Sequence, residues 1–263
     1  MDDRVYWATC SWDELPEHDD WLGVAERQQR ATLRFPKRRH DWRLGRWTAK
    51  QAVRCALECE AESWTGHAPF AAPAMDEIRM LATAPAMDGI QILAAADGAP
   101  EPSLASDAGA GNVVLSLSHS ADRGFAVASP TPMALGCDVE RIEPRSEAFI
   151  ADFFAVQELP GLVVLSRTFH RDLAATLIWS AKESALKALR TGLRQDTRSV
   201  AVDVDVSRGE LSVLSAKGEL RGWWWVDEGF VHTLVSDSTR GRLLQARAEA
   251  KEAGGGGSGG GGG

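Results

Sequence analysis

The stretch LGCDVERIE, from Leu135 to Glu143, places acidic residues in a segment that is otherwise typical of a buried strand and its exit. Because successive strand side chains alternate between two faces, we expect Asp138 and Glu140 on one face and Cys137 and Val139 on the other. Two adjacent carboxylates repel each other unless a cation lies between them, and such hard oxygen ligands suit Mg²⁺ or Mn²⁺. The alternative is a pair of acids that faces solvent.

The composition indicates a globular protein. The chain has 263 residues, of which 44% are hydrophobic, so it can bury one large core or two smaller ones. A formal net charge of −8 argues against a general nucleic-acid binder, and any phosphate ligand would need a local basic cluster. The N-terminus lacks the features of a signal peptide, and no apolar run approaches the ~18 residues of a membrane span. We therefore expect a cytoplasmic protein that does not cross a membrane.

The cysteines do not indicate a metal site. Cys10, Cys55, Cys59 and Cys137 form no CxxC pair and no zinc-type cluster with histidine, so we expect reduced thiols and no zinc. The glycine-rich sequence from Gly254 onward cannot form a core and is typical of a flexible linker.

The hydrophobic pattern predicts an α+β fold. Helices are expected over about 25–62, from 146 to 154 and over about 168–190, with a break at Pro160 and Gly161 between the last two. A strand pair is expected between about 77 and 100, followed by a loop over 103–112. Further strands are expected at 113–120, 124–129, 134–140, 199–206, 210–215, 221–227 and 230–236. Each half thus holds a long helix and several strands, which suits two related lobes.

A second charged cluster lies in LIWSAKESALKAL, residues 177–189. At about 100° per residue, Trp179, Glu183, Leu186 and Lys187 fall on one side of a helix. The bland alternative is a solvated ion pair between Glu183 and Lys187. However, charged groups beside an apolar stripe are costly unless something ionic binds there, so the pattern favours a site.

Two further segments suit phosphate binding. In SLSHS, residues 116–120, hydroxyls and the imidazole of His119 lie at a strand end, where they could meet a phosphate, although such a histidine is more often structural. In KRRHDWRLGR, residues 37–46, Arg39, Arg43 and Arg46 fall on a common helix face, either as an array for phosphate oxygens or as a solvated basic face.

Taken together and in this order, the motifs resemble those of the 4′-phosphopantetheinyl transferases, specifically the larger surfactin-type group. The matching segments are KRRHDWRLGR, DGAPE, LSLSHS, LGCDVE, FFAVQE and WSAKESALKAL, spread over 37–189. The resemblance implies two similar α/β lobes related by a pseudo-twofold axis, with coenzyme A in the cleft between them. The expected lobes are 1–133 and 134–247, with 248–263 as a glycine-rich tail.

The resemblance also implies roles for individual residues. Asp138, Glu140 and Glu183 match Mg²⁺ ligands, with Mn²⁺ as an alternative ion, and Glu183 matches the residue that takes the proton from the carrier serine. The family's coenzyme A-binding positions match Arg39, Arg46, Ser118, His119 and Lys187. Of these, His119 and Lys187 match positions that bind the pyrophosphate. The implied catalytic residues are His119, Lys187 and Glu183. The sequence departs from the family at GAP, which replaces the commoner GKP, and at ALRTGLRQD, where a glycine-rich segment is usual.

The implied activity is that of a holo-[acyl-carrier-protein] synthase. The enzyme would transfer the 4′-phosphopantetheine of coenzyme A to a serine of an apo acyl or peptidyl carrier protein, releasing adenosine 3′,5′-bisphosphate. We expect a monomer that binds no nucleic acid. Two alternatives stay open, a noncatalytic coenzyme A-binding partner of a synthase and a metal-dependent nucleotide hydrolase.

Overall fold

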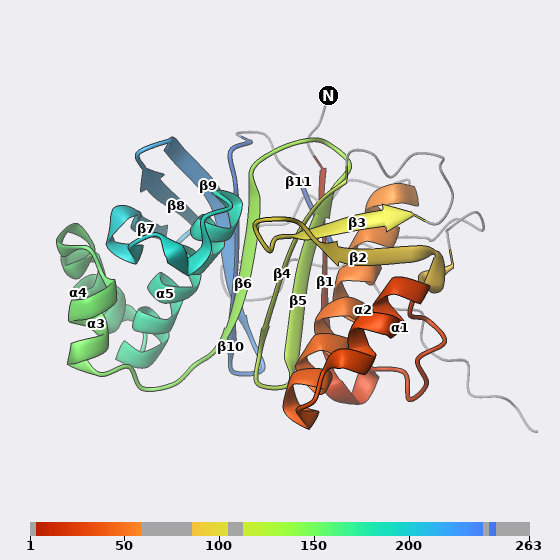
Figure 1. Cartoon of the computed structure of the whole chain (residues 1–263). Coiled ribbons are helices and arrows are strands. Elements are labelled where there is room, and N and C mark those ends of the chain that lie inside the picture. The colour runs from red at the N-terminus through yellow and green to blue at the C-terminus, as the bar shows by residue number, and fades with distance from the viewer. Residues whose placement is uncertain (1–3, 59–85, 105–112, 239–241, 246–263) are drawn as a thin grey trace, which may run out of the picture.

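The fold combines helices and sheets, as the sequence predicted (Figure 1). The computed structural model describes residues 4–58, 86–104, 113–238 and 242–245. The helices are α1 (Val24–Thr32), α2 (Pro36–Glu58), α3 (Glu147–Phe153), α4 (Leu159–Thr168) and α5 (Arg171–Ala188). The strands are β1 (Arg4–Ser11), β2 (Ile90–Ala94), β3 (Pro100–Leu104), β4 (Val114–Ser120), β5 (Arg123–Ser129), β6 (Leu135–Arg141), β7 (Ala201–Asp205), β8 (Glu210–Ser215), β9 (Gly218–Asp227), β10 (Phe230–Ser236) and β11 (Arg242–Gln245).

The strands form two main sheets and one separate hairpin. The first sheet has the order β11-β1-β5-β4 and the second β6-β10-β9-β8-β7, while among the described strands β2 and β3 pair only with each other. In Figure 1 the first sheet and strands β6 and β10 occupy the centre, with α1 and α2 on the right, while β7 and β8 lie on the left with α3, α4 and α5. No helix among the residues described is long and apolar enough to span a membrane.

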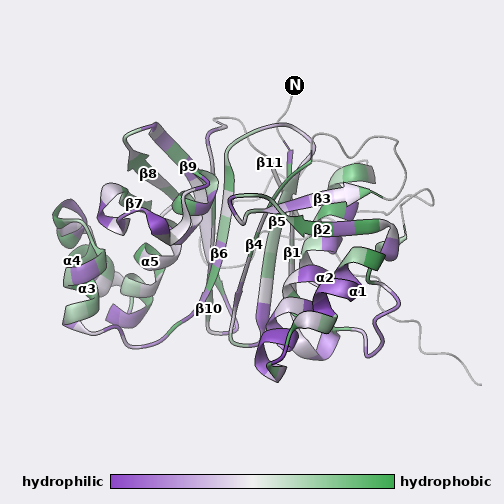
Figure 2. Cartoon of the chain, viewed as in Figure 1, coloured by the Kyte–Doolittle hydropathy of each residue, from purple (hydrophilic) through white to green (hydrophobic). Residues whose placement is uncertain are grey.

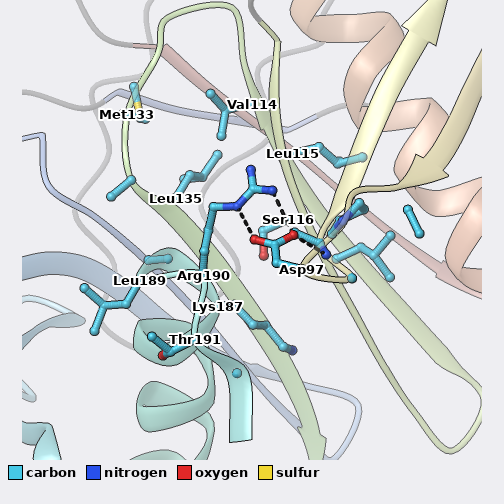
Figure 3. A pocket seen from close by; sticks show the side chains of 18 of the residues that line it. Asp97, Val114, Leu115, Ser116, Met133, Leu135, Lys187, Leu189, Arg190 and Thr191 are labelled. Atoms are coloured by element: carbon cyan, nitrogen blue, oxygen red, sulfur yellow. Dashed lines mark hydrogen bonds and ion pairs between the residues drawn. The ribbon is translucent and has the colours of Figure 1, made fainter. Parts of the chain in front are cut away.

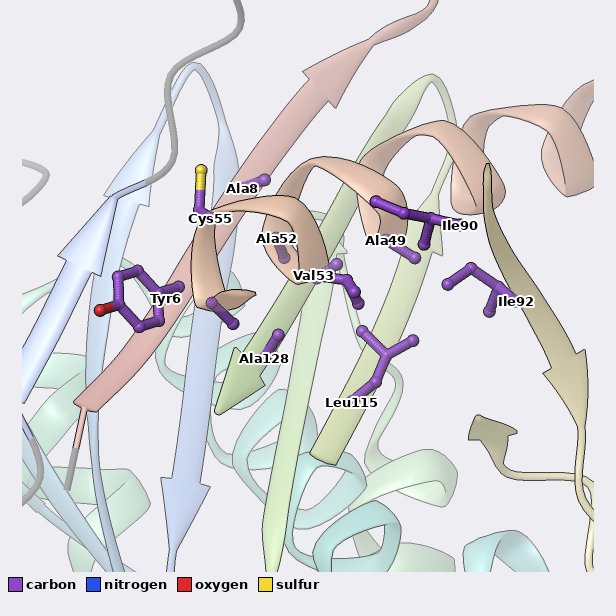
Figure 4. Packing of buried hydrophobic residues seen from close by; sticks show 12 residues of the cluster. Tyr6, Ala8, Ala49, Ala52, Val53, Cys55, Ile90, Ile92, Leu115 and Ala128 are labelled. Carbon is purple, nitrogen blue, oxygen red and sulfur yellow. The ribbon is translucent and has the colours of Figure 1, made fainter. Parts of the chain in front are cut away.

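Side-chain alternation gives each sheet two apolar faces. In β1, Tyr6 and Ala8 pack with Ala49, Ala52 and other residues of α2 (Figure 4). Their neighbours Val5 and Trp7 point to the opposite face and pack with Val139 and Trp225 of the second sheet. The two sheets therefore pack face to face, and each long helix covers an outer face. Figure 2 shows the same pattern, since hydrophobic colour is concentrated on the central strands and the buried sides of the helices.

The Trp223–Trp225 run follows this alternation. Trp225 packs against Trp7, with ring centroids 4.9 Å apart, in the layer between the sheets, and Trp223 packs against the edge of that layer. Trp224 points the other way, where its ring meets that of Phe169 at 5.7 Å beneath the helical layer. Both faces of β9 are covered along this run.

Two predicted helix boundaries were wrong, both at prolines. The expected helix over 25–62 is divided into α1 and α2, because the residue before Pro36 avoids helical geometry while proline itself fits a first helical turn. For the same reason Pro160 lies in the first turn of α4 rather than in a break between helices. The end of the expected helix, with Cys59, and most of the loop over 103–112 lie outside the described residues.

The strand neighbours also differ from a simple succession. Of the strands expected at 113–120, 124–129 and 134–140, β4 and β5 pair with each other, whereas β6 pairs with β10 in the other sheet. Cys10 and Cys137 are buried and form no disulfide within the described residues, and Cys55 is buried as well.

A buried ion pair anchors α2 in the first half of the chain. The side chains of Lys50 and Glu26 are both fully buried, with Nζ and Oε2 2.6 Å apart. Lys50 also donates to the carbonyls of Trp21 and Met87, at 2.8 and 2.9 Å. Glu26 accepts the backbone N–H of Gly23 and that of a residue in β2, Ile92, both at 2.9 Å. Every charge of this pair is therefore compensated within the core.

The second half repeats this arrangement on α5. Lys182 and Glu158 are buried, with Nζ and Oε2 2.7 Å apart. Lys182 donates to two carbonyls, those of Thr197 and Val200, at 3.0 and 2.7 Å. Glu158 accepts the N–H of the residue three positions before it, as Glu26 does, at 2.6 Å, and that of Val202 in β7 at 2.8 Å.

The repeated contacts coincide with a repeat in the sequence. Segment 47–57, WTAKQAVRCAL, can be aligned with segment 179–189, WSAKESALKAL, and the alignment superposes Lys50 on Lys182. The strand order β1-β5-β4 likewise corresponds to β6-β10-β9. Under this alignment Glu183 and Lys187 correspond to Gln51 and Cys55, so the two charged residues occur only in the second half.

Candidate functional site

The site begins where the edges of the two main sheets meet, along β4 and β6. Alternate serines of β4 reach across to β6, because they share one face of the strand. Ser116 Oγ accepts the backbone N–H of Cys137 at 3.0 Å, and Ser118 Oγ donates to Asp138 Oδ1 at 2.6 Å. The hydroxyl pattern of SLSHS therefore joins the sheets and also holds one carboxylate.

Gly136 allows α5 to lie directly on β6. A Cβ atom at this position would stand 1.9 Å from the carbonyl oxygen of Ser184 and 2.6 Å from the backbone nitrogen of Ala188, so any other residue would push the helix away. This close approach brings Lys187 within reach of the strand. Its Nζ lies 2.7 Å from Asp138 Oδ1.

Asp138 is the most buried carboxylate of the cluster, with 2% of its surface exposed. Its Oδ1 accepts hydrogen bonds from Ser118 Oγ and Lys187 Nζ. Its Oδ2 is buried without a hydrogen-bond partner among the described residues. Burial alone would lower the pKa of Lys187, but the combined attraction of Asp138, Cys137 and Glu183 outweighs burial and raises that pKa. The lysine is therefore a fixed positive charge, and Asp138 keeps one oxygen available for a further cation.

Glu140 lies on the same face of β6, as expected. The indole Nε1 of Trp179 donates to its Oε1 at 3.2 Å, and Arg145 Nη2 lies 3.3 Å from its Oε2. Ser120 Oγ also donates to Oε2, at 3.4 Å. Burial first, and then repulsion by Asp138, raise the pKa of Glu140 despite the opposing effect of Arg145.

Glu183 completes a group of three carboxylates. It is partly buried on α5, one helical turn before Lys187. Burial, followed by repulsion from Asp138 and Glu140, raises the pKa of Glu183 to about 7, although Lys187 acts in the opposite direction. Three acids that perturb one another in this way form a strongly negative site.

The donor set fits a divalent cation. The cluster combines three hard oxygen donors, an unpartnered oxygen on Asp138, and repulsion that positive charge would relieve. Within residues 4–58, 86–104, 113–238 and 242–245, however, no three such side chains converge closely enough to form a ready metal site. Lys187 contacts one oxygen of Asp138, and Trp179 and Arg145 contact the two oxygens of Glu140.

A cavity of about 990 Å³ adjoins this cluster (Figure 3). Such a volume is ample for a small-molecule ligand. Apolar side chains from β4 and β6, including Leu115, Leu117 and Leu135, form part of its wall. The charged residues in the lining are Arg46, Asp97, Lys187, Arg190, Arg194 and Lys217. A cavity with this basic excess, in a chain of net charge −8, is the local basic cluster that an anionic ligand requires.

His119 lies on the opposite face of β4 from the serines. Its Nε2 is 3.9 Å from Asp41 Oδ2, and it lines a second hollow of about 530 Å³ together with Arg46 and Trp42. Burial lowers the pKa of His119. Asp41 acts in the opposite direction, and Lys187 lowers the pKa further, so a neutral imidazole is favoured. His119 is near the carboxylate cluster without contacting it.

The basic residues of α2 do not converge as one array. Arg46 lines both cavities, whereas Arg39 is exposed and lines neither. Arg43 turns to the N-terminal loop, where Nη2 donates to the carbonyl of Pro16 at 2.6 Å and Nε lies 2.9 Å from Asp19 Oδ1. Arg43 therefore serves neither as part of a phosphate-binding array nor as part of a solvated basic face, because loop carbonyls accept from its Nη2 and Asp19 lies beside its Nε.

Several contributors were missed by sequence reasoning. Arg145 links Glu140 and Glu143, with its Nη1 3.0 Å from Glu143 Oε1, and Glu143 is otherwise exposed to solvent. The buried pair of Lys182 and Glu158 was also missed. Comparison of the chain with itself would have revealed Lys182, since the WTAKQ and WSAKE segments both carry the buried lysine.

The comparison with known families bears directly on this cluster. The model of the 4′-phosphopantetheinyl transferase superfamily matches residues 134–235. The match covers less than half of the chain but includes β6 and α5, and hence Asp138, Glu140, Glu183 and Lys187. A search of curated proteins found no significant match.

The match confirms the resemblance at the level of the superfamily and over this segment. In that range the chain is similar to transferases that move phosphopantetheine from coenzyme A to carrier proteins, typically with a divalent metal. Ser118, His119, Arg39 and Arg46 lie outside the matched range. The assignments of His119 and Arg46 rest on the motifs and on their positions in the cavity linings, whereas those of Ser118 and Arg39 rest on the motifs alone.

Proposed function

We propose that this protein is a 4′-phosphopantetheinyl transferase of the surfactin-type group. It transfers the phosphopantetheine arm of coenzyme A to a serine of an apo acyl or peptidyl carrier protein, and adenosine 3′,5′-bisphosphate leaves. The observation that carries the proposal is the pairing of Lys187, which lines the basic cavity, with Asp138 in the carboxylate cluster, within the segment that resembles this superfamily.

The roles follow from the charges of these side chains. Asp138, Glu140 and Glu183 would hold Mg²⁺, or Mn²⁺, which neutralises phosphate oxygens when bound. Lys187 presents a permanent positive charge to the same cavity. The remaining contacts with coenzyme A are assigned to Ser118, His119, Arg39 and Arg46.

The reaction needs no covalent enzyme intermediate. The carrier serine Oγ attacks the β-phosphorus of coenzyme A, forming an oxygen–phosphorus bond, while the bond to the bridging oxygen breaks and adenosine 3′,5′-bisphosphate departs. The serine proton passes to the carboxylate of Glu183, directly or through water. Lys187 counters the negative charge on the pyrophosphate, and the neutral imidazole of His119 donates a hydrogen bond to it.

We also infer that the two halves are lobes related by a pseudo-twofold axis, with 1–133 and 134–247 as the two lobes and the active site in the cleft between them. The repeated lysine–glutamate pairs on α2 and α5 and the matching strand orders support this relation. Strand β11 crosses the division, since it pairs with β1 in the first sheet.

The decisive experiment is a transfer assay followed by mass spectrometry. The protein is incubated with coenzyme A, Mg²⁺ and a panel of apo carrier proteins, and one carrier should gain the mass of one phosphopantetheine group. A matched reaction without Mg²⁺ should leave that carrier unmodified. Absence of modification on every carrier would refute the transferase.

The competing functions give different results in the same assay. A noncatalytic partner of a synthase would bind coenzyme A in calorimetry and modify no carrier. A metal-dependent nucleotide hydrolase would release phosphate products in the absence of any carrier.

A further inference from the structure

A group of ion pairs crosses the cavity from one half of the chain to the other (Figure 3). Arg190 follows the last turn of α5, and its guanidinium makes a bidentate pair with Asp97 in the turn between β2 and β3. The distances are 2.7 Å from Nε to Oδ2 and 2.9 Å from Nη2 to Oδ1. The same Nη2 lies 3.1 Å from Oε1 of Glu101 in β3. This planar, two-pronged geometry fixes direction as well as distance.

A second arginine strengthens the same link. Arg194 Nη1 donates to the backbone carbonyl of Asp97 at 3.2 Å, and its Nη2 donates to the carbonyl of Arg190 at 3.4 Å. The hydrogen bonds of Arg190 also lower the pKa of Asp97, so this carboxylate stays ionised. We call Asp97, Glu101, Arg190 and Arg194 the arginine clasp.

The backbone at Arg190 points to a role beyond ending the helix. Arg190 has a φ of +56°, in the left-handed region where glycine is the least strained residue and commonly ends helices. An arginine at this position therefore accepts backbone strain, which its side-chain contacts must offset. Strain held at such a residue is typical of functional positions.

The clasp fixes the turn of the β2–β3 hairpin. Within the described residues this hairpin pairs with neither main sheet; Ile90 and Ile92 anchor β2 in the core, and the clasp holds the turn at the other end of the strand. Asp97, Arg190 and Arg194 line the same cavity as Lys187, which precedes Arg190 by less than one helical turn. A shift of the turn would widen the cavity on the side facing α5 without touching the carboxylate cluster.

We propose that Arg190 is a positioning residue for coenzyme A, which holds the Asp97–Glu101 turn against the end of α5 and so sets the width of the binding cavity. This inference rests on the proposed transferase function. It assigns a purpose to the two segments that depart from the family pattern, DGAP and ALRTGLRQD. Arg190, which follows α5, binds the β2–β3 turn that contains the GAP segment.

The test compares Arg190→Gly and Arg190→Lys with the wild type in the transfer assay. Loss of an exposed bidentate pair should raise KM for coenzyme A about fivefold, equivalent to ~1 kcal/mol, with kcat almost unchanged. Arg190→Lys, which keeps one charged contact, should give an intermediate KM. The midpoint of thermal unfolding of Arg190→Gly should equal or exceed that of the wild type, because glycine relieves the backbone strain.

Arg198→Gln is the matched control. Arg198 forms a similar exposed ion pair with Asp196, at 2.9 Å, and does not line the cavity. Its loss should leave KM unchanged. An Arg190→Gly variant with wild-type KM, or one that simply loses stability and kcat together, would overturn the proposal. If the wild type modifies no carrier, the transferase proposal fails instead, which is a distinct result.

Discussion

The most informative perturbation is Lys182→Met, which removes one partner of a buried ion pair. Lys182 and Glu158 are 0% and 1% exposed, and their charged atoms are 2.7 Å apart. The substitution leaves the Glu158 carboxylate without a cation and deprives the carbonyls of Thr197 and Val200 of their donor. Breaking a buried pair in this way costs roughly 3–5 kcal/mol, a large fraction of the ~5–15 kcal/mol that stabilises a folded protein.

The free energy of unfolding should be measured by urea denaturation at neutral pH. The difference in free energy of unfolding between the wild type and the variant should become smaller as the pH falls. Burial already raises the pKa of Glu158, and without Lys182 its carboxylate would take up a proton more readily. Adding Glu158→Met should recover part of the loss, since no charge then remains buried.

Two further substitutions test the reasoning. Lys50→Met breaks the equivalent pair in the first half, so it should cost a similar amount. Arg221→Met disrupts an exposed pair with Glu219 and should change stability by less than ~0.5 kcal/mol. If Lys182→Met and Lys50→Met both lie within ~1 kcal/mol of the wild type, the view that these pairs anchor the helices is refuted.

Three more predictions concern the site and its support. Glu183→Gln should lower the transfer rate at least about a hundredfold while thermal unfolding stays equal or rises, because one repelling charge is removed; an unchanged rate would exclude Glu183 as the base. Gly136→Ala should destabilise by ~1–3 kcal/mol or more and impair transfer, whereas Gly161→Ala, with open space around it, should be nearly neutral in urea denaturation. Burial, with a smaller effect of Arg123, lowers the pKa of His232 in the folded protein to about 3. Below about pH 6.5 the histidine of the unfolded chain binds a proton that the folded protein does not, so the free energy of unfolding falls as the pH drops. Between about pH 7 and about pH 5 the wild type should lose ~2 kcal/mol more than His232→Phe, and equal losses would contradict this assignment.

Much of the site could be predicted because its residues share short segments. Alternation along one strand placed Asp138 and Glu140 together, and helical spacing placed Glu183 near Lys187. The pairing of β6 with β10 could not be predicted, since neighbours in a sheet depend on packing between distant segments. The partners of Arg43 could not be predicted either, because its side chain donates to the carbonyl of a loop residue that is distant in sequence.

The sequence by itself determined the alternation of helices and strands and the chemical type of the donors, because these depend on local periodicity and on side-chain identity. Only the tertiary structure decided that Gly136 lets α5 approach β6, that the serines of β4 join the sheets, and that Arg190 reaches Asp97 across the cavity. Asp97 and Arg190 are 93 residues apart, so no local pattern connects them. Their contact depends on how the two halves pack, which arises from the sum of many buried apolar contacts.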